Sequence, residues 1–140
     1  MPEDLEPDDD WKADIKAYYE PDGKLASSFG KKFEIRPQQR DMAIAIGDAI
    51  SAEHHLVVEA GTGVGKSFAY LIPAILYAVN EGKKVVVSTH TIALQEQILR
   101  KDIPRLKKIL PLQGPAGQGP LELYLSATPG NGHAAAACDV

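Results

Sequence analysis

The chain has 140 residues, a hydrophobic fraction of 44% and a formal net charge of −4, which indicates one globular domain or a piece of a larger one. The acidic N-terminus argues against a secretory signal, and no apolar run is long enough to cross a membrane. The single cysteine, Cys138, excludes an internal disulfide and is typical of a reducing compartment, so we expect a cytoplasmic protein with no membrane partner.

Two helices are expected in the first third of the chain. Residues 1–10 are acidic and are expected to be disordered, and a short helix is expected over residues 11–19. A longer helix should begin near Pro37, because the missing N–H of proline costs no hydrogen bond in a first turn. The apolar residues that follow recur at helical spacing and predict a core face made of Met42, Ala45, Ile46, Ala49 and Ile50.

A phosphate-binding loop is predicted at residues 56–67, LVVEAGTGVGKS. Residues 56–58 predict a short buried strand, the glycine-rich part comes next, and an apolar run of helical length follows Ser67. Strand, glycine-rich loop, Lys-Ser and helix, in this order, are the context that such a loop requires. The alternative is a glycine-rich turn that is followed by Lys-Ser by chance.

The residue types of this loop suit the binding of nucleotide phosphates. Glycine lets several backbone N–H groups point into one concavity, and the helix that follows adds unpaired N–H groups. Lys66 is expected to reach the β- and γ-phosphates, and the Ser67 hydroxyl is expected to ligate Mg²⁺. The other expected nucleotide contacts in the loop are Ala60, Gly61, Thr62, Gly63, Val64 and Gly65.

A second buried strand is predicted at residues 85–89, VVVST, after a helix that contains Pro73 and should bend there. Two apolar strands joined by a helix form a βαβ unit. The strands at 56–58 and 85–89 should therefore be parallel, with a right-handed crossover. The expected fold class is α/β, with a parallel βαβ core and flanking helices.

The last third of the chain changes character. A third helix is expected after Thr91, and Asp102 is expected to cap a short helix over residues 103–110. Residues 100–108 carry five cations against one carboxylate. Residues 111–140 contain no Lys or Arg and are rich in Pro, Gly and Ala, so this tail is expected to be mostly disordered.

Four stretches of the chain resemble the DinG-type, XPD-related branch of the superfamily 2 DNA helicases. They are YYEPDGKLA, RPQQRDMA, EAGTGVGKSFAYLIPA and VVVSTHTIALQEQI, and the resemblance extends from about Ile15 to Pro111. Ala60 stands where the phosphate loop is usually written with Gly, and alanine is regular there in this branch. The resemblance implies a partial RecA-like P-loop NTPase lobe at residues 11–110. It also implies an intact protein that hydrolyses ATP to translocate 5′→3′ along single-stranded DNA.

The resemblance implies roles for particular residues. Gln39 matches the glutamine that contacts the adenine edge of ATP, and Lys66 and Ser67 match the γ-phosphate and Mg²⁺ ligands. The residues expected to face single-stranded DNA, in the loop and helix start after the second strand, are Thr89, His90, Thr91 and Gln95. Without the resemblance, Gln39 would be interpreted as an exposed polar residue and Thr89–Thr91 as a helix N-cap.

Several motifs of an intact helicase are not found in this sequence. An Asp-Glu pair after a buried strand is missing, as are the second motor lobe and the four cysteines of the iron–sulfur cluster that the full-length branch members carry. We therefore expect the chain to lack turnover on its own. The alternatives are another P-loop enzyme, such as a small-molecule kinase, and a truncated fragment without enzymatic activity.

The tail allows a specific interpretation. In the branch, the chain should continue as Lys-Gly-Arg-x-Asn-Tyr-x-Cys-x-x-Arg, and residues 117–130 do not resemble this pattern. Permitted codons for residues 117–130, read with one base dropped, encode VKGRSNYICLRRL, which does resemble it. We interpret residues from about 113 onward as an out-of-frame translation, in which Cys138 has no function. The alternative is a genuine Pro/Gly-rich disordered tail.

Overall fold

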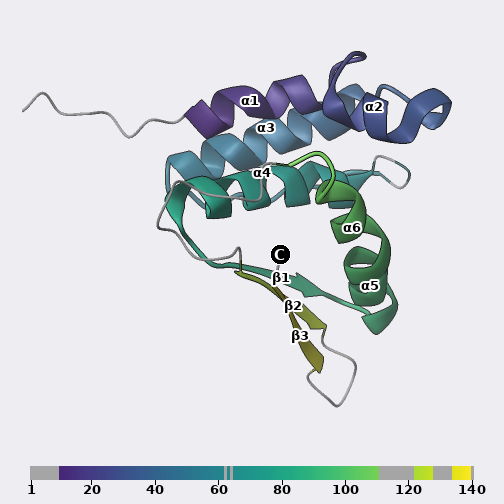
Figure 1. The fold of residues 1–140 in the computed structure, drawn as a ribbon. Helices are drawn as coiled ribbons and strands as arrows, with labels where there is room; N and C mark the ends of the chain where they lie inside the picture. The colour runs from purple at the N-terminus through teal and green to yellow at the C-terminus, as the bar shows by residue number, and fades with distance from the viewer. Residues whose placement is uncertain (1–9, 62, 64, 111–121, 128–133, 140) are drawn as a thin grey trace, which may run out of the picture. The chain divides into compact units, whose positions relative to one another are not determined.

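The computed structural model describes residues 10–61, 63, 65–110, 122–127 and 134–139 (Figure 1). Disorder is expected for residues 1–10; residues 1–9 lie outside these ranges, and Asp10 differs from the expectation because it begins helix α1. By its contacts the chain divides into two units, Met1–Pro73 and Ala74–Val140, and the boundary falls inside helix α4 (Lys66–Glu81).

The first unit is helical in its described part. Its elements are α1 (Asp10–Tyr18), α2 (Lys24–Phe29), the 3₁₀ turn η1 (Gly30–Lys32), α3 (Pro37–Ser51) and the first half of α4. α1 and α3 lie where the sequence predicts helices, and Pro37 occupies the first turn of α3 as expected. These two helices lie side by side (Figure 1).

The contact between α1 and α3 uses a stripe of α3 that contains small residues. The buried residues of α3 are Gln39, Ala43 and Gly47, which share one face at a spacing of four residues. A side chain at Gly47 would collide with Cδ1 of Ile15, which is fully buried on α1. Glycine at this position is therefore what allows α1 to approach so closely.

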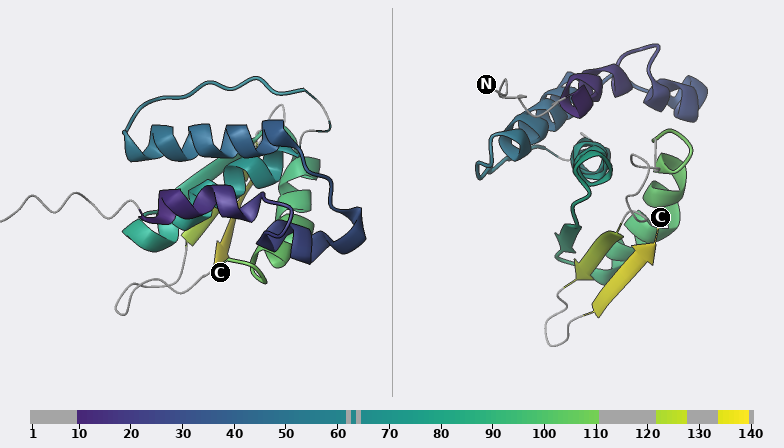
Figure 2. Two further views of the ribbon diagram at one scale, coloured as in Figure 1. Left: turned by 90° about the horizontal axis from the view of Figure 1, so that it is seen from above. Right: turned by 60° about the vertical axis from the view of Figure 1, so that its left-hand side comes forward.

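The core face predicted for α3 is wrong, because its members are only half-buried: Met42, Ala45, Ile46, Ala49 and Ile50. Four of them line a cavity of about 440 Å³ together with residues of the extended segment 54–58, which runs back along α3 (Figure 2). The stripe with the small residues is buried instead, because α1 can pack most densely where the side chains are short.

Residues 56–58 do not form the strand that the sequence predicts. They are extended but pair with no strand in the described part of the chain, and Val57 is 96% exposed. A strand is stabilised when a neighbouring strand satisfies its N–H and C=O groups. This segment instead lies along α3, whose backbone groups are already paired within the helix (Figure 2). Among the described residues, the predicted βαβ unit from 56–58 to 85–89 is therefore not formed.

The second unit contains the sheet. Its strands are β1 (Val85–Thr89), β2 (Glu122–Ala127) and β3 (Ala134–Asp139), with β2 between the other two (Figure 1). β1 pairs with β2 in parallel, with Val87 opposite Leu125. β2 pairs with β3 antiparallel, with Leu125 opposite Ala136. β1 coincides with the second strand that the sequence predicts, but its partner is a later strand.

β2 and β3 fall in the tail for which the composition predicts disorder. The structure differs from that prediction at these two strands, while residues 111–121, 128–133 and 140 lie outside the described ranges. Residues 122–127, ELYLSA, include residue types that favour strands, and β1 offers a row of backbone groups to pair with. The available strand edge therefore decides the local structure here more than the average composition of the tail.

The helical run after β1 contains a wide turn. α5 (Ile92–Gln97), the π-helical turn η2 (Ile98–Asp102) and α6 (Ile103–Leu106) follow one another without a break. The Ile103 N–H bonds to the C=O of Ile98, five residues back. Pro104 explains the wider turn, because it has no N–H and its ring crowds the preceding turn of a regular α-helix.

Asp102 lies inside this run, with φ −74° and ψ −50°, and it makes no capping hydrogen bond. The prediction that Asp102 caps a new helix is therefore wrong. The physical reason is the π turn, which absorbs Pro104 without ending the helix, so no new N-terminus needs a cap.

Helix α4 runs unbroken through Pro73 and ends at Glu81, after which Gly82 has a φ of +61°. A positive φ favours glycine and is typical of a helix C-terminus. Within the described ranges, neither α4 nor any other helix combines the length and the apolar character that a membrane crossing needs.

Candidate functional site

The glycine-rich loop contains two glycines with left-handed backbone conformations. Gly63 and Gly65 both have a φ of +79°, a region that other residues rarely adopt. Gly65 is followed at once by Lys66, the first residue of α4. The loop therefore leads directly into a helix N-terminus, where backbone N–H groups lack intrahelical partners and the helix dipole is positive. Thr62 and Val64 lie outside the described residues.

The predicted phosphate ligands lie on the first turn of α4. The side chain of Lys66 is exposed and that of Ser67 is half-buried. The Ala69 N–H bonds to the C=O of Gly65 at 3.3 Å, so helical bonding begins immediately at the loop. This geometry brings a cation, a hydroxyl and a helix start to one place, as anion binding requires. The other predicted loop contacts that the structure describes are Ala60 and Gly61.

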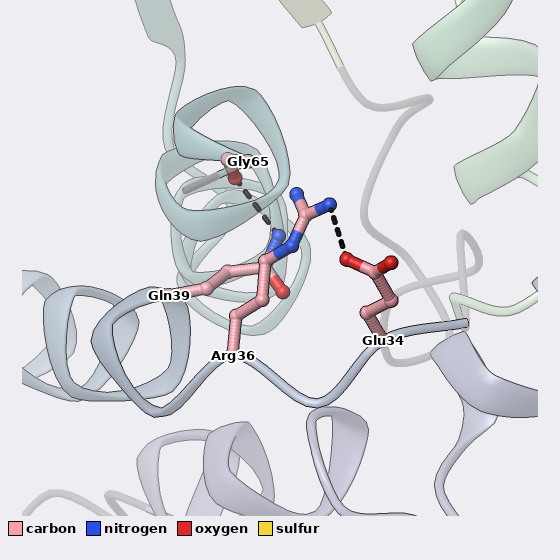
Figure 3. Close-up of polar contacts among 4 residues, drawn as sticks. All are labelled: Glu34, Arg36, Gln39 and Gly65. Carbon is pink, nitrogen blue, oxygen red and sulfur yellow. Dashed lines mark hydrogen bonds and ion pairs between the residues drawn. The ribbon is translucent and has the colours of Figure 1, made fainter. Parts of the chain in front are cut away.

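Gln39 is tied to this loop by a hydrogen bond (Figure 3). Its side-chain N–H donates to the C=O of Gly65 at 2.9 Å, and the residue is only 6% exposed. The alternative interpretation of Gln39 as an exposed polar residue is therefore wrong. A Cβ at position 65 would collide with the same amide group. Gln39 thus holds the loop backbone and also explains why position 65 must be glycine.

A small cavity lies beside this hydrogen bond. Its volume is about 160 Å³, and its lining includes Phe29, Phe33 and Phe68 together with Gln39 and Gly65. The Phe29 ring meets the Phe68 ring edge-on, with 5.5 Å between centroids, and lies 6.4 Å from the Phe33 ring. Apolar walls with a few placed polar groups are typical of small-molecule sites.

Arg36 and Glu34 also line this cavity, and Figure 3 shows the ion pair between them. Arg36 Nη2 is 3.1 Å from Glu34 Oε2, and the Glu34 side chain is largely exposed. Residues 24–34 show no clear periodicity, so the sequence does not mark Phe29, Phe33 or Glu34 as site residues. The one sequence signal is the Arg-Pro pair, which marks the start of the helix that carries Gln39 to the loop.

Tyr19, just after α1, is joined to the start of α4. Its hydroxyl donates to the C=O of Phe68 at 2.7 Å, although the two residues are 49 positions apart in the sequence. Burial raises the pKa of the Tyr19 phenol, so it remains protonated and able to donate at neutral pH. This hydrogen bond holds the helical turn that carries Lys66 and Ser67.

The residues predicted to face DNA include two buried and two exposed ones. Thr89 is buried at the end of β1, where its hydroxyl donates to the C=O of Thr91 at 2.9 Å, and Gln95 is buried on α5. The side-chain oxygen of Thr91 accepts from the Leu94 N–H at 3.2 Å, which confirms the N-cap interpretation for Thr91. His90 and Thr91 are exposed where α5 begins.

The chain is similar to known helicases. Residues 37–119 match the family profile described as DEAD/DEAH box helicase. The chain is 41% identical over 105 residues to the ATP-dependent DNA helicase YoaA of Haemophilus influenzae, a match that covers 75% of this chain and 16% of that protein. It is 45% identical over 102 residues to the ATP-dependent DNA helicase DinG of Escherichia coli, which covers 71% of this chain and 14% of that protein.

A third relative shows higher identity over a shorter region. The ATP-dependent helicase DinG of Mycobacterium tuberculosis is 54% identical over 71 residues, which is 51% of this chain and 11% of that protein. The matches to these three relatives thus span only 11–16% of the relatives' own length. The family match includes α3, the glycine-rich loop, α4, β1 and α5.

Proposed function

Because the chain belongs to the DEAD/DEAH box helicase family, we propose that it is the nucleotide-binding part of an ATP-dependent DNA helicase of the DinG type. Membership of this family implies a RecA-like P-loop fold. The observation that carries the proposal is the loop itself: Gly63 and Gly65 adopt a φ of +79° directly before the exposed Lys66 and the half-buried Ser67 at the start of α4.

The phosphates of ATP bind at this loop. The backbone N–H groups of the loop and of the α4 N-terminus hold the phosphate oxygens, and the Lys66 ammonium pairs with the β- and γ-phosphates. The Ser67 hydroxyl supplies an oxygen ligand of the kind that Mg²⁺ prefers. When bound, Mg²⁺ neutralises charge on the phosphates during transfer of the γ-phosphoryl group to water.

The adenine base binds in the cavity beside Gln39. One N–H of the Gln39 amide holds the C=O of Gly65, and the amide also has a carbonyl oxygen and a second N–H to offer to a base edge. The phenylalanine rings of the cavity provide apolar contact area for the base. Because one amide group serves the base and the loop, recognition of the base and the shape of the loop are coupled.

The remaining parts of the proposal concern the whole protein. Single-stranded DNA contacts the exposed His90 and Thr91 at the start of α5. Residues 56–58 join a parallel βαβ core in the complete RecA-like lobe. Their exposure in this chain supports this step, because three consecutive apolar residues in an extended segment are typical of a strand that lacks its partner. The intact protein acts in the cytoplasm and carries the iron–sulfur cluster, whose cysteines this chain lacks.

Competition for nucleotide binding tests the proposal. The 140-residue chain is titrated with a fluorescent ATP analogue in the presence of Mg²⁺, and ATP, GTP and pyrophosphate are added as competitors. We expect ATP to compete best, because Gln39 and the phenylalanine cavity favour adenine. Equal competition by all three would contradict the assignment of the adenine site. A folded chain that binds none of them would contradict the nucleotide site as a whole.

A further inference from the structure

The helical run from α5 to α6 has one buried side. Its buried residues recur every three or four positions once the extra residue of the π turn is allowed for, and they are Gln95, Ile98, Asp102, Ile103, Leu106 and Leu110. Helical hydrogen bonding continues to the end of this series, since the Leu110 N–H bonds to the C=O of Leu106 at 2.9 Å. At the start of the run, α5 contacts β1 and β2.

The opposite side of this run is strongly basic. Four exposed cations lie on it as two pairs, Arg100 with Lys101 and Lys107 with Lys108. The two pairs are seven residues apart, which is about two helical turns or about 10 Å along the axis. We call these four residues the basic face.

Carboxylates do little to neutralise the basic face. Glu96 lies 3.9 Å from Arg100 in an exposed ion pair, which is weak in water. Asp102 is buried, and Lys101 is the member of the basic face whose charge acts on its carboxylate. The basic face is therefore a local excess of positive charge on a chain whose formal net charge is −4.

We propose that the basic face binds the phosphate backbone of a DNA strand and prolongs the DNA contact beyond the start of α5. This inference rests on the proposed function, in which the exposed His90 and Thr91 at the N-terminus of the same helical run touch single-stranded DNA. Lysine and arginine neutralise phosphates and release counterions, which supplies affinity that does not depend on sequence.

The chemistry of the surface favours a nucleic acid over other anionic partners. The exposed residues between positions 96 and 108 include no aromatic and no branched aliphatic side chain. A membrane-binding helix would turn an apolar face toward the lipid, but the apolar side of this run is buried in the protein. A protein partner would need apolar anchor residues that are absent from this exposed surface.

The same composition predicts how the basic face recognises DNA. Many proteins that bind single strands also stack the bases on aromatic side chains, and residues 91–110 contain no aromatic residue. We therefore expect binding through phosphates alone, with equal affinity for oligo(dT) and oligo(dA) and with a strong dependence on salt.

The test measures oligonucleotide affinity of the full chain by fluorescence anisotropy at several salt concentrations. In Lys107→Ala/Lys108→Ala, two single-strand phosphate contacts are lost. We expect the slope of log K against log salt to fall by about 1.4 and the affinity at 0.1 M salt to fall about 25-fold, taking 1 M salt as the point where the contacts contribute nothing. Lys107→Arg/Lys108→Arg keeps the charge and should bind like the parent chain.

A matched control separates the basic face from net charge. Lys16→Ala/Lys83→Ala removes the same two charges from exposed positions elsewhere and should leave the affinity within about twofold of the parent. An unchanged affinity in the Lys107/Lys108 variant, or an equal loss in the control, would overturn the proposal. Tighter binding to anionic lipid vesicles or to polyglutamate than to oligo(dT) would also overturn it.

Nucleotide binding by the same sample distinguishes this inference from the proposed function. If the chain binds the fluorescent ATP analogue but no oligonucleotide, the DNA surface is wrong and the nucleotide site stands. If it binds the oligonucleotide through Lys107 and Lys108 but no nucleotide, the basic face stands and the nucleotide site is wrong.

Discussion

The carbonyl oxygen of Gly65 accepts two hydrogen bonds, from the Gln39 side chain at 2.9 Å and from the Ala69 N–H at 3.3 Å. A carbonyl has two lone pairs, so both bonds can form together. The last glycine of the loop is therefore held by α3 and by α4 at the same time. The side chains of Lys66 and Ser67 project from a backbone that these two bonds fix in place.

Replacement of Lys66 by alanine tests the phosphate contact. Lys66→Ala removes a charge-assisted hydrogen bond worth about 1.5–3 kcal/mol, so we expect the affinity for ATP·Mg²⁺ to fall about 10- to 100-fold. Calorimetric titration of both proteins measures this difference. Lys16→Ala removes an exposed lysine of α1 and should bind ATP as the parent does. Equal affinity in Lys66→Ala and the parent would exclude a phosphate role for this residue.

Gln39→Glu tests the link between α3 and the loop. Glutamate has the shape of glutamine but, when ionised, no N–H to donate to Gly65, so one buried hydrogen bond worth about 0.5–1.5 kcal/mol is lost. We expect ATP to bind about two- to tenfold more weakly and the preference for ATP over GTP to shrink. Gln38→Glu, the same change at the exposed neighbouring position, is the control. If both variants keep the parent's preference, Gln39 does not recognise the base.

At the level of secondary structure, the π turn η2 aligns two helical segments on one buried side. Ile98 is the first residue of the turn, and Ile103 and Leu106 follow it, yet all three are at most 2% exposed. The turn also places Asp102 on this side. Among the described residues, Asp102 Oδ2 has no hydrogen-bond partner, which is costly for a buried carboxylate.

Burial raises the pKa of Asp102, although a hydrogen bond from Gln97 and the charges of Arg105 and Lys101 oppose the shift. Between the ordinary pKa of an aspartate and this raised value, the folded chain binds more protons than the unfolded chain. The free energy of unfolding therefore decreases as pH rises through this window. Above the window, the folded chain carries the full penalty of a buried, ionised Asp102.

Asp102→Asn removes this penalty. We expect the variant to be more stable than the parent at pH 7, by about 1 kcal/mol, and the two proteins to converge in acid below the ordinary aspartate pKa. Urea unfolding at a series of pH values measures the difference. Asp41→Asn removes a carboxylate from an exposed position of α3 and should leave the free energy of unfolding at pH 7 within about 0.5 kcal/mol of the parent. A variant that is less stable than the parent at pH 7 would mean that the Asp102 carboxylate is well solvated or paired in the folded chain.

At the scale of the whole molecule, a helical unit that carries the proposed nucleotide site is followed by a unit built on a small sheet. Leu56, Val57 and Val58 are 45%, 96% and 40% exposed in the first unit, and Val86 is 66% exposed in the second. Exposed apolar residues on extended segments are typical of surfaces that pair or pack with further chain. The matches to the three relatives span only 11–16% of the relatives' length, so those proteins contain further chain of this kind.

We expect the isolated chain to show no ATP hydrolysis that single-stranded DNA stimulates. Phosphoryl transfer needs groups that position the attacking water and stabilise the transferred phosphoryl group, and the sequence contains no Asp-Glu pair after a buried strand. A phosphate-release assay with and without oligo(dT) measures the activity, with circular dichroism to establish folding. Robust DNA-dependent turnover by the purified chain would contradict this prediction.

The origin of the tail is open to a direct test. If residues from about 113 onward are an out-of-frame translation, sequencing of the locus should reveal helicase motifs in another reading frame after the codon for Leu112. A chain shortened to residues 1–112 should then bind ATP with the parent's affinity, since β2 and β3 would serve no function. Downstream DNA without helicase motifs in any frame would refute the interpretation and leave the tail as a genuine part of the protein.

The sequence by itself determines the local features of the site. Glycine at positions 63 and 65, Lys66-Ser67 and the following apolar run predict the loop and α4, because backbone freedom and helix initiation depend on neighbouring residues. The position of β1 and the N-cap role of Thr91 are local in the same sense. These features can therefore be derived without knowing what the chain packs against.

Tertiary structure decides everything that depends on a partner distant in the sequence. Residues 56–58 have a strand-like composition but form no strand, since their place beside α3 offers no backbone partner. Residues 122–127 lie in a tail whose composition predicts disorder, but they form β2 because β1 offers a strand edge with which they pair. Gln39 is buried and bonded to Gly65, 26 positions away. Burial and pairing are properties of two segments together, so periodicity within one segment cannot determine them.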